Sequence, residues 1–259
     1  ILIETDAPYL APQQVRGKRN EPSYVRFVAE TLAEVKQLTP EDAGRITSHN
    51  AMQLFSMGSM KAPGKIAYQI RESLYLNITN RCTNTCGFCV RFYSDFVKGY
   101  KLRISSEPSP EEVIRAIGDP KNYREVVFCG YGEPLLRLDL VKDVAAWIKQ
   151  QGGRVRINTN GQGNLIHKRN ILPELNGLVD AYSVSLNAEN EEKYLSICKP
   201  VFGAGTYRAV KEFIQEAGKS AEVSVTVVSL PEVDLDACRR IAQDELKVGF
   251  RMRYYDEVG

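Results

Sequence analysis

Short apolar runs alternate with amphipathic segments along most of the chain after residue 65. Runs rich in β-branched and aromatic residues predict six strands, at 74–79, 125–130, 155–160, 181–187, 223–230 and 250–256. Helical periodicity between these runs predicts helices at 138–151, 206–217 and 235–246, and Ser109-Pro110-Glu111-Glu112 is the capping box of a further helix. Alternation of strands and helices on this scale is typical of a parallel sheet with right-handed crossovers, so we expect an α/β fold.

One face of several predicted strands is polar. Arg156, Asn158 and Asn160 share one parity of their strand, and Ser183 and Ser185 share one parity of the next. A closed eight-stranded barrel fills its interior with bulky aliphatic side chains instead, and the six units are too few for one. We therefore expect an open (βα)6 partial TIM barrel with a polar lumen that holds a polar ligand. A solvent-exposed sheet face is the alternative, although parallel sheets are normally covered on both sides.

The first part of the chain follows a different pattern. Residues 1–60 predict a mostly helical fragment, in which Thr39 caps a helix that runs through Phe55. A segment with Pro and Gly follows and predicts a linker to about residue 65. We therefore expect two domains, at 1–60 and 66–259.

Composition limits the classes of function. The net charge is +2, so no global basic field argues for a nucleic-acid partner, and no apolar run is long enough to span a membrane. No signal peptide opens the sequence. Of the six cysteines only three cluster, and the rest lack the spacing of a disulfide framework, which favours a reducing, cytoplasmic location.

The three clustered cysteines are Cys82, Cys86 and Cys89, directly after the first predicted strand. The carboxyl ends of strands are where chemistry is placed in barrel-like α/β folds. Three thiolates in a short loop can hold an iron–sulfur cluster with one iron left for a non-protein ligand. A zinc site completed by a distant ligand is the alternative, and only His49 and His167 exist as histidine candidates.

Three motifs, each after a predicted strand, carry a family resemblance. Residues 82–89, CTNTCGFC, are followed by CGYGEP at 129–134 and NTNG at 158–161. In this order the motifs resemble those of the radical S-adenosylmethionine (SAM) enzymes, with Tyr131 in place of one glycine of that family's Gly-Gly-Glu motif. The resemblance covers residues 66–259, and the family's strand 5 glycine/isoleucine motif has no clear match.

The resemblance implies a [4Fe–4S] cluster and SAM as cofactors. Cys82, Cys86 and Cys89 would hold the cluster, and SAM would chelate the fourth iron. Glu133 would accept hydrogen bonds from the SAM ammonium group, because a carboxylate suits a cation and glycines allow close backbone approach. The other residues implied in SAM binding are Phe88, Gly130, Tyr131, Gly132, Asn158, Asn160, Ser183, Ser185 and Val228.

The family's reaction would be reductive cleavage of SAM followed by hydrogen abstraction from a substrate, with a reductant such as flavodoxin or ferredoxin. The sequence does not name the substrate. Arg156, Arg251 and Arg253 could bind its carboxylate or phosphate, with salt bridges inside the protein as the alternative. The loop 91–103 carries cationic and aromatic side chains that could clamp an anionic substrate or a nucleic-acid strand, or pack under the loop. A cluster-bearing redox sensor is a non-enzymatic alternative.

The N-terminal residues resemble another family. ILIETDAPYLAP and the following RGKRNEPSYV are similar to the C-terminal end of the TatD family of metal-dependent hydrolases and DNases, over residues 1–56. The resemblance implies that ETDAP is a last barrel strand with Asp6 as a metal ligand. One carboxylate cannot hold a hydrolytic metal pair, so we expect a nuclease-inactive fragment in a fusion with a radical SAM domain. A TatD-like hydrolase is the alternative function.

Overall fold

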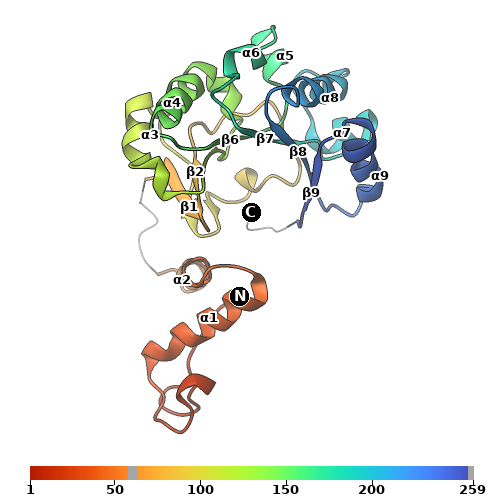
Figure 1. Ribbon diagram of the computed structural model, residues 1–259. Coiled ribbons are helices and arrows are strands. Elements are labelled where there is room, and N and C mark those ends of the chain that lie inside the picture. The colour runs from red at the N-terminus through yellow and green to blue at the C-terminus, as the bar shows by residue number, and fades with distance from the viewer. Residues whose placement is uncertain (58–62, 256–259) are drawn as a thin grey trace. The chain divides into compact units, whose positions relative to one another are not determined.

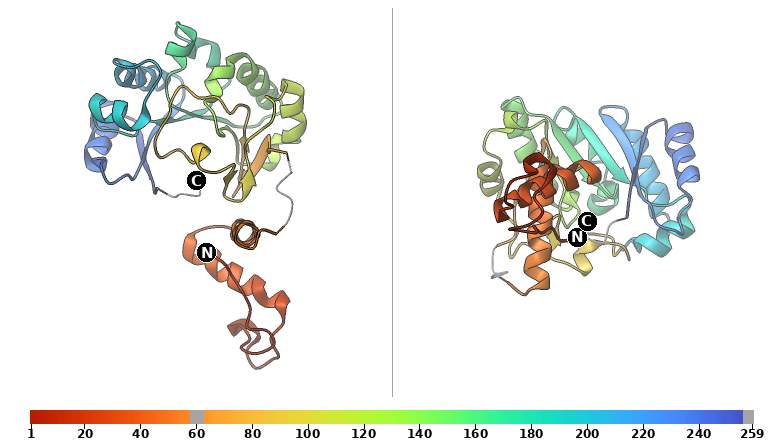
Figure 2. Two further views of the ribbon diagram at one scale, coloured as in Figure 1. Left: turned by 180° about the vertical axis from the view of Figure 1, so that it is seen from behind. Right: turned by 90° about the horizontal axis from the view of Figure 1, so that it is seen from below.

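A computed structural model describes residues 1–57 and 63–255, which divide into two compact units (Figures 1 and 2). One unit comprises residues 1–63 with 96–101, and the other comprises residues 64–95 with 102–259. Lys61 and Ala62 of the predicted linker, and Asp256, the last residue of the last predicted strand, lie outside the described residues.

The larger unit is an α/β fold built on a mostly parallel sheet of seven strands. The strands are β1 (Ala67–Ile70), β2 (Ser73–Leu76), β5 (Glu125–Phe128), β6 (Val155–Thr159), β7 (Ala181–Ser185), β8 (Glu222–Val228) and β9 (Gly249–Arg253). They pair in chain order, with β1 antiparallel to β2 and every later neighbour parallel. The carboxyl ends of the six parallel strands therefore lie along one edge of the sheet.

Helices follow the strands and cover one face of the sheet (Figure 1). They are α3 (Pro110–Ile117), α4 (Leu138–Gln150), α5 (Gly163–His167), α6 (Leu172–Leu175), α7 (Glu191–Cys198), α8 (Thr206–Ala217) and α9 (Leu235–Arg240). One continuous core joins their apolar stripes to one parity of the strands, such as Ile157 of β6 and Val184 of β7 with Val144 of α4 and Phe213 of α8. The opposite parity of β6 and β7 is the polar one, as the alternation predicted.

Strand β1 was not predicted from the sequence. It pairs with β2 through a tight turn in which Arg71 has a left-handed backbone, with φ of 53°. Such turns usually carry Asn-Gly or Asp-Gly, and Arg71-Glu72 gives no such signal. The six predicted strands are all present, and five of them end two or three residues earlier than predicted, as β2 does at Leu76.

The predicted helices largely agree with the structure. The capping box of α3 is present, with the Ser109 side chain accepting from the Glu112 amide and the Glu112 side chain accepting from the Ser109 amide. The predicted helix 235–246 was too long as a regular helix, because α9 gives way to a π-helical turn at Ile241–Glu245. Helices α5, α6 and α7 are too short to show helical periodicity and were not predicted.

The smaller unit is mostly helical, with α1 (Val25–Lys36), α2 (Pro40–Leu54) and the hairpin β3 (Phe96–Val97) and β4 (Tyr100–Lys101). Thr39 caps α2 as predicted, by accepting from the Asp42 amide at 3.1 Å. Arg45 of α2 stacks 3.7 Å from the Tyr100 ring and donates to the Lys98 carbonyl at 2.8 Å. Residues 1–6 form no strand, because a barrel strand needs neighbouring strands for its hydrogen bonds and the described residues offer none there.

Candidate functional site

Three segments of the chain meet at the carboxyl edge of the sheet, after β2, β5 and β6. The segments are 81–89, 130–133 and 158–161, the last of which includes the final two residues of β6. Hydrogen bonds join them directly: the Glu133 amide donates to the Arg81 carbonyl at 2.8 Å, and the Asn160 amide donates to Glu133 Oε2 at 2.7 Å. Asn160 Nδ2 also donates to Thr83 Oγ1 at 2.8 Å. The fold therefore brings together three motifs that lie far apart in the sequence.

The cysteines lie in an irregular loop before the 3-10 turn Val90–Phe92. Cys82, Cys86 and Cys89 are half-buried free thiols. Among the described residues, no three or more His, Cys, Asp or Glu side chains are grouped so that they could hold one metal ion. A cubic iron–sulfur cluster does not require this convergence, because each thiolate binds a different iron. The donor set thus fits a cluster better than a single zinc ion.

Two arginine side chains in the segment after the cysteines form hydrogen bonds and an ion pair that stabilise the cysteine loop. Arg91 donates to the Asn80 carbonyl at 3.2 Å and to the Asn84 carbonyl at 2.5 Å. Arg103 forms an ion pair with Asp95 and donates to the Arg91 carbonyl at 2.6 Å. Arg91 and Arg103 thus contact the protein's own backbone and the Asp95 carboxylate, which is the packed alternative for these two residues of the 91–103 loop.

The three thiols hold their protons in the metal-free chain. Burial raises the pKa of Cys82 to about 12, and burial also raises the pKa of Cys89. The pKa of Cys86 is raised chiefly by a hydrogen bond with the Cys198 thiol, and then by burial. Because metals bind thiolates, loading of a metal group at this loop must release protons.

Gly130 and Gly132 are glycines because the segment after β2 packs against them. A Cβ atom at Gly130 would lie 2.2 Å from Asn77 Oδ1, and one at Gly132 would lie 2.2 Å from the Arg81 carbonyl oxygen and 2.5 Å from that of Thr79. The nearest obstructing atoms at Gly132 belong to the backbone, and at Gly130 the Asn77 Cα is also only 2.8 Å away, so these atoms cannot move aside as the end of a flexible side chain can. The two glycines therefore set the distance between the glycine segment and the chain that leads into Cys82.

Tyr131, which replaces a glycine of the family motif, is buried and points away from solvent. Its amide donates to Asn77 Oδ1 at 3.2 Å, and its hydroxyl donates to the Ser94 carbonyl. The Arg103 guanidinium lies 5.6 Å from the centre of its ring. The Tyr131 side chain thus links segment 130–133 by a hydrogen bond to the segment that follows the cysteines.

Glu133 has a fully buried carboxylate with three donors. Oε1 accepts from the Leu135 amide at 3.1 Å and from Thr159 Oγ1 at 2.7 Å, and Oε2 accepts from the Asn160 amide. Burial raises the pKa of Glu133 to about 7, although these hydrogen bonds favour the charged form. The carboxylate ties the segment after β5 to the segment after β6, a structural role that the sequence did not indicate. A contact with the SAM ammonium group stays a prediction.

The raised pKa of Glu133 predicts a pH-dependent stability. The folded state retains a proton that the unfolded state releases at about pH 4.5, so this contribution is full below that pH and is lost as the pH rises to about 7. We expect the free energy of unfolding to fall by up to about 3 kcal/mol over this interval. Urea unfolding at several pH values should show this slope in the wild type and a flatter profile in Glu133→Gln. The control Glu111→Gln removes an exposed carboxylate, and an unchanged slope in Glu133→Gln would contradict the assignment.

The other residues expected to contact SAM lie on successive strands. Asn158 of β6 is half-buried, and its register partner Ser183 on β7 is buried, with Ser185 further along the same strand. Val228 is the buried last residue of β8, and Phe88 packs from the cysteine loop against the core. Their part in binding SAM remains a prediction.

The three candidate arginines differ in their partners. Arg156 is half-buried and forms a two-pronged ion pair with Glu125, at 2.9 and 3.1 Å, and it donates to Asn158 Oδ1 at 2.5 Å. This ion pair is the internal salt bridge given above as the alternative, and a contact of Arg156 with substrate stays a prediction. Arg251 and Arg253 lie on one face of β9, are exposed, and form no ion pair with any described residue.

A buried polar network beside the cysteine loop was not predicted. Gln162 Nε2 donates to Asn84 Oδ1 at 2.7 Å and contacts the Tyr194 hydroxyl at 2.9 Å. The Gln162 amide donates to Asn160 Oδ1 at 3.0 Å, which links the network to the third motif. Only the closeness of Gln162 to NTNG in the sequence could have indicated it, because Tyr194 comes from α7, far along the chain.

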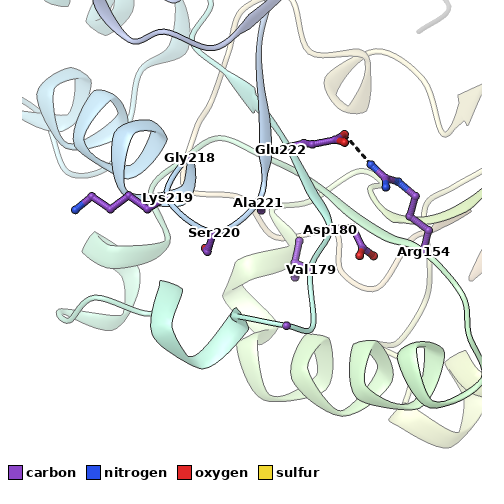
Figure 3. A pocket seen from close by; sticks show the side chains of 9 residues that line it. Arg154, Val179, Asp180, Gly218, Lys219, Ser220, Ala221 and Glu222 are labelled. Atoms are coloured by element: carbon purple, nitrogen blue, oxygen red, sulfur yellow. Dashed lines mark hydrogen bonds and ion pairs between the residues drawn. The ribbon is translucent and has the colours of Figure 1, made fainter.

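A hollow of about 540 Å³ lies elsewhere, at the amino ends of β6, β7 and β8 (Figure 3). Its charged side chains are paired, since Arg154 contacts Glu222 at 2.7 Å and Asp180 contacts Lys149 at 2.7 Å. It is on the edge opposite to the cysteine loop, whereas ligands of parallel α/β sheets bind at the carboxyl edge. The hollow is therefore separate from the candidate site.

The fold and the three joined motifs define a class of protein, and sequence comparison agrees. The family model described as "Radical SAM superfamily" matches residues 76–244, so the chain belongs to the radical SAM superfamily. This membership implies a [4Fe–4S] cluster and SAM as cofactors. It also supports an enzymatic function.

Solved structures share the fold. The chain is similar to Streptococcus suis SuiB bound to S-adenosylmethionine, with a TM-score of 0.53 and 13% identity over 89% of this chain and 51% of the other. It is also similar to TYW1 with a lysine-pyruvate adduct bound, with a TM-score of 0.50 and 14% identity over 80% of this chain and 72% of the other. At these identities the likeness concerns the fold alone.

The N-terminal residues match a second family. The model described as "TatD related DNase" matches residues 1–56. Over 55 residues the chain is 58% identical to the uncharacterized metal-dependent hydrolase YabD of Bacillus subtilis, and over 61 residues it is 43% identical to YcfH of Escherichia coli. These stretches cover 21% and 24% of this chain, and the chain spans only 22% and 23% of the length of these curated relatives. The resemblance to hydrolases thus fits the N-terminal segment only.

No helix within residues 1–57 and 63–255 has both the length and the apolar character to cross a membrane.

Proposed function

We propose that this chain is a radical SAM enzyme in which Cys82, Cys86 and Cys89 hold a [4Fe–4S] cluster with one iron left for SAM. The observation that carries the proposal is the joining of the cysteine loop to the glycine segment and to the segment after β6, through Glu133 and Asn160. These hydrogen bonds place the Glu133 carboxylate and the Asn160 side chain beside the cysteine loop. They support a second ligand bound beside the cysteines.

When bound, a cluster charged by a one-electron reductant would supply the electron for cleaving a carbon–sulfur bond of SAM, and the chemistry would lead to hydrogen abstraction from the substrate. The protein's residues orient these groups and exclude water. Gly130, Tyr131, Gly132 and Glu133 would receive the amino end of SAM, where backbone carbonyls and a carboxylate suit a cation. The remaining proposed SAM contacts are Phe88, Asn158, Asn160, Ser183, Ser185 and Val228.

We further propose that the sheet is an open (βα)6 partial barrel whose polar face lines a lumen for an anionic substrate. Helices cover the apolar face, while Asn158 and Ser183 occupy the other. Of the candidate arginines, Arg251 and Arg253 are the ones whose guanidinium groups have no carboxylate partner among the described residues. They are the proposed substrate contacts, because a guanidinium binds carboxylates and phosphates in two-pronged geometry.

The proposed domains are 1–60, a TatD-like fragment, and 66–259, the radical SAM core. The fragment supplies one candidate metal ligand, Asp6, so hydrolysis or DNA cleavage by this chain is the weaker alternative. A reductant of the flavodoxin or ferredoxin type would deliver the electron. A reducing compartment such as the cytoplasm suits thiols that are all free in the structure.

Anaerobic incubation with SAM and dithionite tests the proposal. We expect a brown protein with about four irons per chain after reconstitution. We also expect release of 5′-deoxyadenosine, measured by liquid chromatography with mass spectrometry. A colourless protein that contains zinc, or an iron-loaded protein that neither binds nor cleaves SAM, would overturn the proposal. Cleavage of DNA with a divalent metal, lost in Asp6→Ala, would support the alternative.

A further inference from the structure

A fourth cysteine lies beside the cysteine loop although it is outside the motif. Cys198 is the last residue of α7 and is fully buried. The end of this helix receives the backbone of the loop: the Thr85 amide donates to the Cys198 carbonyl at 3.1 Å, and the Gly87 amide donates to the Ile197 carbonyl at 3.1 Å. These two bonds flank Cys86 and hold it against Cys198.

The Cys198 thiol lies within interaction distance of Cys86, because it is the chief cause of the raised pKa of the Cys86 thiol. Asn187 Nδ2 approaches the Cys198 sulfur at 3.9 Å as a donor, so this sulfur already accepts on one side. Once Cys86 is a metal-bound thiolate it has no proton, and only the Cys198 S–H can then donate.

We infer that Cys198 is a positioning residue for the iron–sulfur group, whose buried S–H donates a hydrogen bond to the Cys86 thiolate and raises the reduction potential of the cluster. A donor beside a cluster ligand stabilises the reduced state most, because that state carries the additional negative charge. Cys198 has no solvent access through which water could replace its S–H. This inference rests on the proposed function.

A redox titration of the reconstituted protein followed by electron paramagnetic resonance tests the inference. We expect the midpoint potential of Cys198→Ala to shift in the negative direction, by about 59 mV if the reduced fraction at a fixed potential falls about tenfold. Cys198→Ser keeps a hydroxyl donor and should lie closer to the wild type. Cys238→Ala is the control, because Cys238 is an equally buried thiol in α9.

The outcomes separate the inference from the proposed function. Equal potentials in the wild type and Cys198→Ala, both with full iron content, would overturn the inference and leave the cluster assignment intact. An equal shift in Cys198→Ala and Cys198→Ser would also overturn it, because packing and not the donor would then be responsible. Loss of iron in both variants with retention in Cys238→Ala would make Cys198 a structural requirement instead. Absence of a cluster in the wild type would reject the proposed function itself.

Discussion

Replacement of Cys82, Cys86 or Cys89 by alanine, one at a time, is expected to reduce the iron content to background and to abolish release of 5′-deoxyadenosine. Each thiolate would bind a different iron, so neither of the other two motif cysteines can substitute for the one removed. The expected loss of SAM cleavage is at least about a thousandfold, since it follows from loss of the cofactor and not from misplacement of a residue. Iron analysis and mass spectrometry of the product measure the two effects.

Cys238→Ala is the matched control for this series, because it removes a thiol from α9 without touching the loop. It should retain both iron and activity. Circular dichroism of each variant must show that the fold persists, as expected for half-buried side chains in an irregular loop. A Cys86→Ala protein that still binds four irons and cleaves SAM would contradict the assignment of the ligands.

The second large effect is expected for Gly132→Ala. The new methyl group would lie 2.2 Å from the Arg81 carbonyl oxygen and 2.5 Å from that of Thr79, so the backbone leading into Cys82 must move. We expect a loss of about 3 kcal/mol in the free energy of unfolding, at the upper end for overpacking. We also expect much reduced retention of iron. Urea unfolding and iron analysis after gel filtration measure these effects.

The control for this prediction is Gly87→Ala, in the cysteine loop itself. A Cβ atom at Gly87 would meet no heavy atom within 4 Å, and its φ is not in the left-handed region. Stability and iron content should therefore remain close to the wild type. If Gly87→Ala is as damaging as Gly132→Ala, close packing is not the reason for glycine at position 132.

The strands of this fold were predictable because each one alternates or buries apolar residues over several positions. Val155 and Ile157, for example, face the helices while Arg156 and Asn158 face the other way, which fixes both strand and face. Strand β1 was not predictable in the same way, because its turn at Arg71 lacks the residues that usually adopt a left-handed backbone. Local periodicity therefore indicates where a strand lies and which of its faces is buried, but it does not indicate a tight turn made of residues that are unusual for turns.

Only the part of the site that consists of short sequence motifs was predictable. Parallel strands place their carboxyl ends at one edge, so the segments at Cys82, Gly130 and Asn158 could be expected to meet. Side chains that support them from other elements, such as Tyr194 and Cys198 of α7, carry no local signal. Their position depends on how α7 packs, which only the tertiary structure supplies.

Arg156 shows why a charged residue in a polar strand is weak support for a substrate contact. Its partner Glu125 lies on the neighbouring strand, 31 residues away, and the parallel register that pairs them is a property of the sheet. The sequence alone does not show that Arg156 has an internal carboxylate partner whereas Arg251 and Arg253 have none within the described part of the chain. Their exposure and the absence of an ion pair with the described residues make the difference.

The N-terminal segment shows how high identity over a short stretch differs from a shared fold. At 58% identity over 55 residues, its relation to the hydrolase sequences is close. Helices α1 and α2 form through their own local pattern, while residues 1–6 remain irregular because a strand depends on neighbours. Sequence similarity therefore does not carry the hydrolytic site into this chain.

The central claim is that three cysteines leave one iron of a cluster open for SAM. Electron paramagnetic resonance of the dithionite-reduced, reconstituted protein tests it most directly, with and without SAM. We expect the signal of a reduced [4Fe–4S] cluster whose g values change when SAM is added, because SAM becomes a ligand of the open iron. A cluster signal that SAM leaves unchanged, together with no SAM binding by calorimetry, would contradict the account and favour a redox-sensing role.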